Sequence, residues 1–370
     1  MKRIFTTIFI GFLGLNLTAC SFMKSKSEVK TTSPAPPKTA AVQPPSNTVT
    51  LLGAGSTFGY PLYSKMFQAY YKKRGVKVNY EPIGSGGGQR QLFNKTVDFG
   101  ASDVYLTSAQ MKKTKDSILN MPTCMGAVAV TYNLPGNPVL KFTPQILAGI
   151  FLGTIKKWNN PAIEKVNKGI HLPDLPIMTV HRTDGSGDTG IFTSYLAKVS
   201  ASWKKKVGHG LAVSWPNGLG AKGNAGVAGL IEKTPGSIGY ITLIYALQNH
   251  MSYGLVMNSH KEFIKPTLKS ISLAGNVKLP PDTRILVTNS NVPGAYPISG
   301  FTWLLFYKNQ KYQGRTKQRA KELVKLLWWM LHKGQKFTKP MDYAPLPPKA
   351  VKLDEKILKS VTFGVKPLLK

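Results

Sequence analysis

Residues 177–199 have the sequence IMTVHRTDGSGDTGIFTSYLAKV. The apolar run Ile177–His181 predicts a strand, and Ile191–Val199 predicts a helix. Between them, Arg182 precedes the Gly/Ser turn Gly185–Gly187. A guanidinium offers a planar fork of donors, and glycines let backbone N–H groups approach a ligand. A helix start adds unpaired N–H groups and the positive end of the helix dipole. Together these features predict a pocket for a small oxyanion.

Two upstream segments have the same arrangement. Gly53–Phe58 (GAGSTF) precedes the helical pattern Phe58–Lys73, and Gly84–Gly88 (GSGGG) precedes the helical pattern Gln89–Lys95. A single turn of this kind often only caps a helix. Three of them favour a shared site, because in an open α/β sheet such loops lie at the carboxyl ends of the strands.

Apolar runs alternate with helical patterns along the rest of the chain, which predicts an α/β fold with largely parallel sheets. Further strands are expected at Thr50–Gly53, Val76–Tyr80, Val97–Ala101, Gly236–Ile241 and Gly300–Tyr307, and further helices at Ser108–Leu119, Asn224–Glu232 and Gln318–His332. Trp328 and Trp329 flank the apolar stripe of the last helix, and such tandem tryptophans are more typical of packing than of a ligand site.

The N-terminus has the pattern of an export signal. Two basic residues precede the apolar run Ile4–Leu17, which is too short to span a bilayer, and Leu-Thr-Ala then precedes Cys20. Residues 1–19 are therefore expected to be a signal peptide, and Cys20 resembles the lipidated cysteine of a bacterial lipoprotein. An ordinary signal peptide with an incidental cysteine is the alternative. Residues 20–48, rich in Pro, Ser and Lys, are expected to form a disordered tether.

The chain is strongly basic, with 49 Lys and Arg against 16 Asp and Glu and a net charge of +33. Residues 307–370 alone contain 16 basic and 4 acidic residues. Such a field attracts anions, although export argues against a specific nucleic-acid partner. Two explanations remain: a solvated lysine-rich surface, or a surface-exposed adhesin or polyanion-binding face in this C-terminal region, either instead of or in addition to a small-anion site.

Two acidic residues stand near the predicted anion pocket. Asp103 follows the strand Val97–Ala101, and Asp188 follows the turn at Gly187. A buried carboxylate accepts the O–H of a protonated oxyanion such as hydrogen phosphate and rejects sulfate, which carries no proton. Such a site can discriminate strongly against an analogue that lacks the hydrogen-bonding group. The alternative is that both residues cap helices.

From Val49 to Lys370 the chain resembles the phosphate-binding protein of bacterial phosphate ABC transporters. The resemblance depends on motifs that cover nearly the whole folded part in the family's order: Gly53–Phe58, Asn79–Tyr80 with Ile83–Gly87, Val97–Asp103, Gly153–Trp158, Arg182–Ser186 with Phe192–Leu196, and Gly223–Asn224 with Gly236–Tyr240.

The resemblance implies a two-lobed periplasmic-binding-protein-like fold (type II), in which each lobe is a mostly parallel sheet flanked by helices and crossing strands form the hinge. Lobe 1 would comprise residues 49–126 and 299–370, and lobe 2 residues 127–298. The residues expected to contact phosphate are Thr57 and Phe58 (backbone N–H), Ser85, Asp103, Arg182, Ser186, Gly187 and Asp188. Asp184 is expected to orient Arg182. Position 188 departs from the commonest family form, which has Thr there.

The implied function is capture of inorganic phosphate and its delivery to an inner-membrane ABC permease, which comprises two permease subunits and an ATPase. We expect a monomer, anchored to a membrane in the periplasm or cell envelope, with no catalytic activity, metal or cofactor. An enzyme that uses Ser85 or Ser186 as nucleophile is disfavoured, because no G-x-S-x-G motif occurs and the six histidines lack metal-ligand spacing. The same fold tuned for sulfate, molybdate or phosphonate is a further alternative.

Overall fold

The computed structural model describes residues 49–369, which all belong to one compact unit, Pro44–Lys370. The predicted signal peptide, Cys20 and the tether 20–48 lie outside the described residues. Among the helices of residues 49–369, none combines the length and the apolar character needed to cross a membrane.

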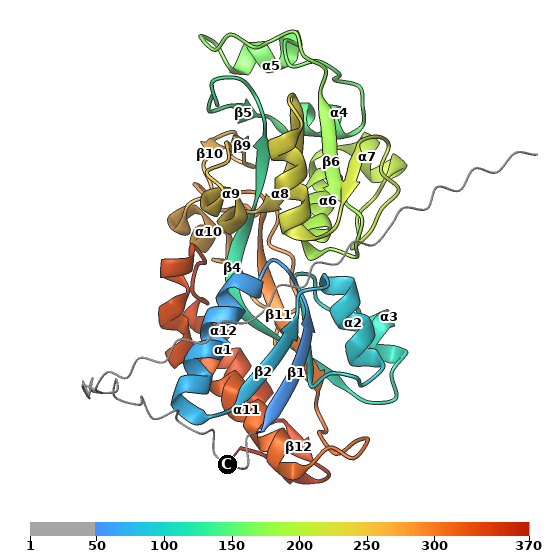
Figure 1. The fold of residues 1–370 in the computed structure, drawn as a ribbon, viewed down its shortest axis with the longest axis vertical. Helices are drawn as coiled ribbons and strands as arrows, with labels where there is room; N and C mark the ends of the chain where they lie inside the picture. The colour runs from blue at the N-terminus through green and yellow to red at the C-terminus, as the bar shows by residue number, and fades with distance from the viewer. Residues whose placement is uncertain (1–48, 370) are drawn as a thin grey trace, which may run out of the picture. The chain divides into compact units, whose positions relative to one another are not determined.

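A mixed sheet of eight strands forms the centre of this unit (Figure 1). Its spatial order is β2 (Lys77–Glu81), β1 (Thr50–Gly55), β3 (Phe99–Ser102), β11 (Ser299–Tyr307), β4 (Ile118–Tyr132), β8 (Ser237–Thr242), β6 (Met178–Arg182) and β7 (Leu219–Ala221). The pairings at both ends of the sheet are parallel, and the pairings of β11 and β4 with their neighbours are antiparallel. The α/β class is confirmed, and the predicted, largely parallel pairing holds within each group of outer strands, whereas β11 and β4 make the sheet mixed.

Strand β4 joins two groups of strands. Its first part, Ile118–Ala127, pairs with β11, and its second part, Val128–Tyr132, pairs with β8. One group, β1 to β3, therefore reaches β4 through β11, whereas the other group, β6 to β8, pairs with it directly. This is the two-lobed arrangement with crossing strands that the sequence predicts. The partner change at Ala127–Val128 supports the predicted lobe limits, which remain a proposal.

Helices cover both groups of strands (Figure 1). They are α1 (Tyr60–Arg74), α2 (Ser85–Phe93), α3 (Ser108–Lys112), α4 (Pro144–Phe151), α5 (Pro161–Val166), α6 (Gly187–Val199), α7 (Ala201–Lys206), α8 (Gly223–Lys233), α9 (Leu243–Gln248), α10 (Leu268–Ala274), α11 (Lys317–Leu331) and α12 (Pro348–Lys359), with 3₁₀ turns at Lys333–Phe337 and Lys339–Met341. Small sheets comprise β5 (Lys141–Phe142), β9 (Leu255–Met257) and β10 (Phe263–Ile264), and β12 (Thr362–Phe363) with β13 (Lys366–Pro367).

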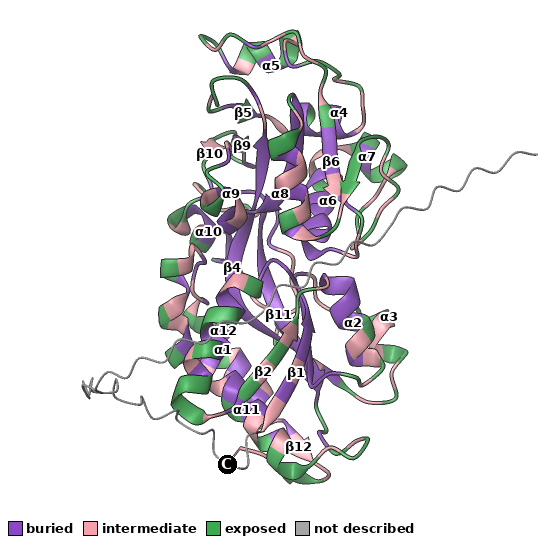
Figure 2. Cartoon of the chain, in the orientation of Figure 1, coloured by how far each residue is buried: buried purple, intermediate pink, exposed green. Residues whose placement is uncertain are grey.

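Alternating burial explains why these segments fold as helices. In α1 the residues Leu62, Met66 and Tyr70 recur at helical spacing and are buried, while Lys73 and Arg74 at its end are exposed. Figure 2 shows exposed and buried positions alternating along the surface helices. The basic last turn also complements the negative end of the helix dipole.

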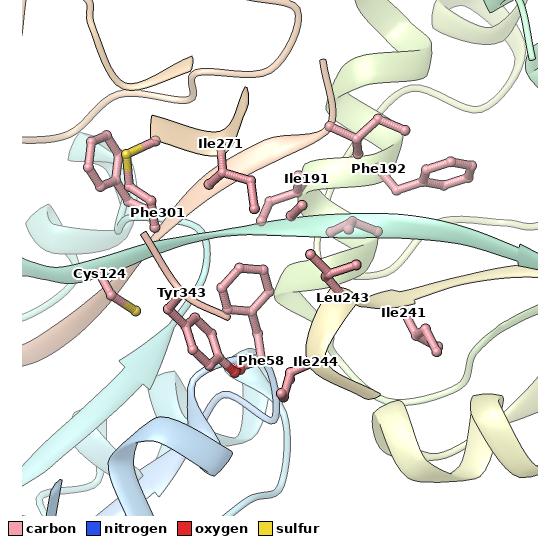
Figure 3. Packing of buried hydrophobic residues seen from close by; sticks show 14 of the residues in the cluster. Phe58, Cys124, Ile191, Phe192, Ile241, Leu243, Ile244, Ile271, Phe301 and Tyr343 are labelled. Atoms are coloured by element: carbon pink, nitrogen blue, oxygen red, sulfur yellow. The ribbon is translucent and has the colours of Figure 1, made fainter. Parts of the chain in front are cut away.

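Apolar side chains from distant parts of the chain pack around β4 (Figure 3). The Phe58 ring lies 6.0 Å from that of Tyr343, whose hydroxyl donates to the Phe58 carbonyl oxygen. Ile191 of α6 packs on Gly300 of β11, where a Cβ would come within 2.5 Å of the isoleucine. Cys124, a free thiol, is fully buried here. The turn after β1 is thereby held against the crossing strands.

The helix predicted at Ser108–Leu119 is shorter than expected and ends at Lys112. The Thr114 hydroxyl donates to the carbonyl oxygens of Met111 and Asp116, which forms a turn instead of a further helical turn. Ile118 already belongs to β4 and pairs with Tyr307 of β11. Strand pairing with a distant segment therefore overrides the local helical pattern.

Candidate anion-binding site

The turn after β1 places two hydroxyls at the site. The Ser56 hydroxyl accepts from the Gly59 backbone N–H at 2.9 Å and donates to Asp103 Oδ1 at 2.5 Å. The Thr57 carbonyl oxygen accepts from the Tyr245 hydroxyl at 2.9 Å, so this turn is tied to both groups of strands. Ser56 is fully buried, and Thr57 is 7% exposed.

The second turn forms the start of α2, which begins at Ser85 rather than at the predicted Gln89. Its glycines lie in the first helical turn because the helix packs directly on the β1 backbone. A Cβ at Gly88 would lie 2.5 Å from the Ala54 carbonyl oxygen. The Ser85 hydroxyl donates to Asp103 Oδ2 and accepts from the Asp103 backbone N–H, each at 3.1 Å.

Asp103 is therefore a buried carboxylate that accepts from two serine hydroxyls, and it is only 1% exposed. Burial raises the pKa of Asp103 to about 7, and the negative charge of Asp188 adds to the increase. The hydrogen bonds from Ser56 and Ser85 oppose this shift. The carboxyl group can therefore gain or lose its proton near neutral pH.

Arg182 ends β6 and supplies the guanidinium of the site. Its Nε donates to Asp184 Oδ1 at 2.7 Å and its Nη2 to Asp184 Oδ2 at 2.5 Å, while its Nη1 donates to Asp188 Oδ2 at 3.0 Å. The predicted pairing of Asp184 with Arg182 is confirmed. Burial alone lowers the pKa of Arg182, but these two carboxylates raise it above its usual value. A guanidinium has five N–H groups, so these bonds leave others free for a ligand.

Asp188 holds several donors in place at the start of α6. Besides Arg182, it accepts from Asn224 Nδ2 at 2.8 Å and from the Thr242 hydroxyl at 2.7 Å. The cap of α6 is Ser186, whose hydroxyl accepts from the Thr189 backbone N–H at 3.2 Å. The alternative that Asp188 caps the helix is therefore wrong, and Asp103 does not cap α3, which begins with Thr107 as its cap.

Contacts between the turns close the site from both sides. The Gly86 backbone N–H donates to the Gly185 carbonyl oxygen at 2.8 Å, and Asn224 Nδ2 donates to the Thr57 hydroxyl at 2.9 Å. A Cβ at Gly187 would overlap Asp103 Oδ2 and lie 2.6 Å from the Ser85 hydroxyl. The turns after β1, β2, β3 and β6 therefore meet at one place.

The charges of this cluster do not simply attract anions. One guanidinium faces the carboxylates of Asp184 and Asp188, and Asp103 adds a further acidic group. Binding of an anion therefore depends on hydrogen-bond donors and on the helix N-termini at Ser85 and Gly187. A ligand that carries its own proton fits best, because it pairs with a carboxylate instead of opposing it.

The contacts above join six of the eight predicted site residues: Thr57, Ser85, Asp103, Arg182, Gly187 and Asp188. The other two, Phe58 and Ser186, lie next to members of this group in the chain. The roles of Ser56, Asn224 and Thr242 are not among those predicted from the sequence. Ser56 and Asn224 belong to the motifs Gly53–Phe58 and Gly223–Asn224, where a polar residue in a turn indicates a possible role in the site. Nothing near Thr242 in the sequence indicates that it contacts Asp188.

Known proteins share this fold. Two groups of strands that share crossing strands, with polar turns meeting between them, define a periplasmic-type solute-binding protein. Residues 40–331 match the family model described as the PBP superfamily domain. A phosphate-binding protein PstS of Xylella fastidiosa is 42% identical over 323 residues, which is 84% of this chain and 86% of the relative.

A second relative, the phosphate-binding protein PstS of Pasteurella multocida, is 39% identical and covers 82% of this chain and 88% of its own length. The chain therefore belongs to the PstS family of phosphate-binding proteins. Solved structures share the fold. A high-affinity periplasmic phosphate-binding protein bound with phosphate has a TM-score of 0.65 at 20% identity and covers 82% of this chain and 92% of its own. An ABC-type phosphate transport receptor from Vibrio cholerae has a TM-score of 0.53 at 17% identity, with 80% of this chain and 100% of the receptor covered.

Proposed function

We propose that this protein captures inorganic phosphate between its two lobes outside the cytoplasm and delivers it to an ABC permease. The residues that we assign to phosphate are those predicted from the sequence: Thr57, Phe58, Ser85, Asp103, Arg182, Ser186, Gly187 and Asp188. The observation that supports this assignment is the convergence of Arg182, the start of α2 and the buried Asp103 on one cluster. The relatives named as phosphate-binding proteins support the same ligand.

Asp103 gives the site its preference for a protonated oxyanion. Hydrogen phosphate donates its O–H to the carboxylate, whereas sulfate places a bare oxygen against it. The arginine and the helix N-termini then bind the remaining phosphate oxygens. Because Asp188 already accepts from three protein donors, its main contribution is to hold Arg182 and Asn224 in position.

Capture requires no bond to form or break. The hydrogen bonds between Gly86 and Gly185 and between Asn224 and Thr57 join the two groups of strands around the site. A ligand that adds further contacts to both groups favours this closed arrangement over an open one. We further propose that lipidated Cys20 anchors the protein to a membrane beside its permease, that it acts as a monomer, and that the site binds without catalysis.

Calorimetric titration with phosphate, sulfate and arsenate tests the ligand assignment. We expect phosphate and arsenate to bind and sulfate to bind at least about a hundredfold more weakly, since the site lacks a donor where sulfate needs one. Arg182→Ala should abolish or strongly reduce phosphate binding, and Asp116→Asn serves as a control. Equal binding of sulfate, or turnover of a chromogenic phosphate ester, contradicts the proposal.

A further inference from the structure

A row of lysines follows one exposed face of α12, far from the anion-binding cluster in the sequence. Lys349, Lys352, Lys356 and Lys359 are three or four residues apart, which places them on one side of the helix. All four are exposed, and none of the ion pairs within residues 49–369 includes them. At 1.5 Å per residue the row is roughly 15 Å long.

This row has opposing effects on the stability of the helix: Lys356 and Lys359 in the last turn complement the helix dipole, but the four charges also act on one another. Like charges at this spacing repel one another and destabilise a helix. The two acidic residues of α12 offer little compensation, because Asp354 is fully buried and Glu355 pairs with His332 at 2.9 Å. The row therefore presents four positive charges that the acidic residues of α12 do not neutralise.

Cavities lie at both ends of the row. One cavity of about 390 Å³ lies between α1, α11 and the end of α12, and its lining includes Lys73, Arg74, Lys325, Lys333 and Lys359. The other cavity, of about 610 Å³, is lined by Lys278 and by the first three lysines of the row, together with Val277 and Leu279. We call the row and its two cavities the basic track. Figure 1 shows α1, α11 and α12 within the same part of the fold.

The first cavity also contains aromatic rings. Trp328 and Trp329 line it beside the five basic residues and are partly exposed. The Trp329 ring lies 5.3 Å from that of Tyr70, and the Trp328 ring lies 4.6 Å from that of His332. These contacts hold the tryptophans in place, so their free surfaces form a fixed apolar platform next to the positive charges.

We propose that the basic track binds a linear anionic glycan, a function separate from phosphate capture. A chain with regularly spaced charges matches a row of lysines that leads from one cavity to the other. The apolar faces of sugar rings pack against the tryptophans, which an inorganic polyanion would leave unused. A flat membrane surface would not enter either cavity.

The probe for this proposal is heparin, a linear sulfated glycan, titrated against the folded chain at several salt concentrations. The test variant carries Lys349→Gln, Lys352→Gln, Lys356→Gln and Lys359→Gln. A matched control carries Lys165→Gln, Lys204→Gln, Lys205→Gln and Lys206→Gln, which removes the same charge from exposed positions elsewhere. Phosphate affinity, measured in parallel, reports the integrity of the fold.

We expect the test variant to bind heparin at least about tenfold more weakly, and the slope of log K against log salt to fall by about 3, as counterion release by four cations requires. The control should lose less than about threefold. Phosphate affinity should not change in either variant. If the four-lysine variant fails to bind phosphate, the pair Lys352→Gln and Lys356→Gln replaces it and should show about half the change in slope.

Three results would overturn the proposal. Equal loss in the control variant would mean that the general positive field, not the track, attracts the polymer. If inorganic polyphosphate or a single-stranded oligonucleotide of equal charge bound as tightly as heparin, the track would not be selective for a glycan. Binding to vesicles of anionic lipid without binding to heparin would identify a membrane surface instead.

Discussion

Replacing Asp103 by Asn tests whether the proton on the ligand decides which anion binds. The two side chains have nearly the same shape, but the hydroxyls of Ser56 and Ser85 donate to different oxygens of Asp103, so only one of them keeps its acceptor and the other must turn to accept from the new amide. Asn adds an N–H₂ donor and removes a charge that is buried to 99% of its surface. The substitution therefore changes hydrogen-bonding character with little change in packing.

The size of the effect follows from the cost of a buried polar group without a partner. In the wild type, a sulfate oxygen would face a carboxylate oxygen with no hydrogen between them, which costs about 1–3 kcal/mol and more when the groups are charged. The amide donor of Asn removes this cost. We expect sulfate affinity to rise by at least about tenfold, the equivalent of about 1.4 kcal/mol, while phosphate affinity falls by less than about tenfold.

The dependence on pH provides a second readout. The pKa of Asp103 is raised to about 7, so the wild-type carboxyl gains a proton and becomes a donor as the pH falls through neutrality. Sulfate itself does not titrate in this range. Wild-type affinity for sulfate should therefore rise by about tenfold between about pH 8 and about pH 6, and the Asn variant should show no such change.

Calorimetry with both anions at the two pH values measures all of these quantities, and Asp116→Asn controls for the loss of one negative charge. The reasoning is refuted if wild-type protein binds sulfate within about tenfold of phosphate at the higher pH. It is also refuted if the Asn variant loses affinity for both anions equally, because Asp103 would then act only as a structural acceptor.

Three further predictions concern the same cluster. Arg182→Ala should weaken phosphate binding by at least about 1.5–3 kcal/mol, the range for a charged hydrogen bond. A smaller loss of binding free energy in calorimetry would mean that Arg182 does not bind phosphate directly. Gly187→Ala should prevent closure and abolish phosphate binding, since its Cβ would overlap Asp103. The control Gly229→Ala, where no atom lies within 4 Å of the added Cβ, should bind phosphate normally. Equal phosphate binding by the two variants would mean that the turns need not meet. Because the folded pKa of Asp103 lies above its unfolded value, its contribution to stability is complete below about pH 4 and is lost as the pH rises through about 7. Melting temperatures of the ligand-free wild type should therefore fall across this range more than those of Asp103→Asn, and identical profiles would contradict the raised pKa.

Local patterns in the sequence were sufficient to predict most of the elements and the turns of the site. The segments after β1 and β6 were located because glycines, hydroxyl residues and the start of a helical pattern are adjacent in the chain. The start of α2 was placed too late, because the glycines at 86–88 resemble a loop unless their close approach to β1 is known. The helix at Ser108 was overextended for a related reason, since its end is set by pairing with β11.

The sequence by itself determined the α/β class, the type of ligand expected and the residues proposed to contact it, since these depend on hydrogen-bonding groups and periodicity within short segments. Only the tertiary structure decided what those residues do to one another. Asp103 meets Ser56 across 47 residues, and Asn224 meets Thr57 across 167. The raised pKa of Asp103, the use of Asp188 to hold Arg182 and the cavity in which Trp328 and Trp329 meet Lys359 all follow from distances and burial, which no local pattern contains.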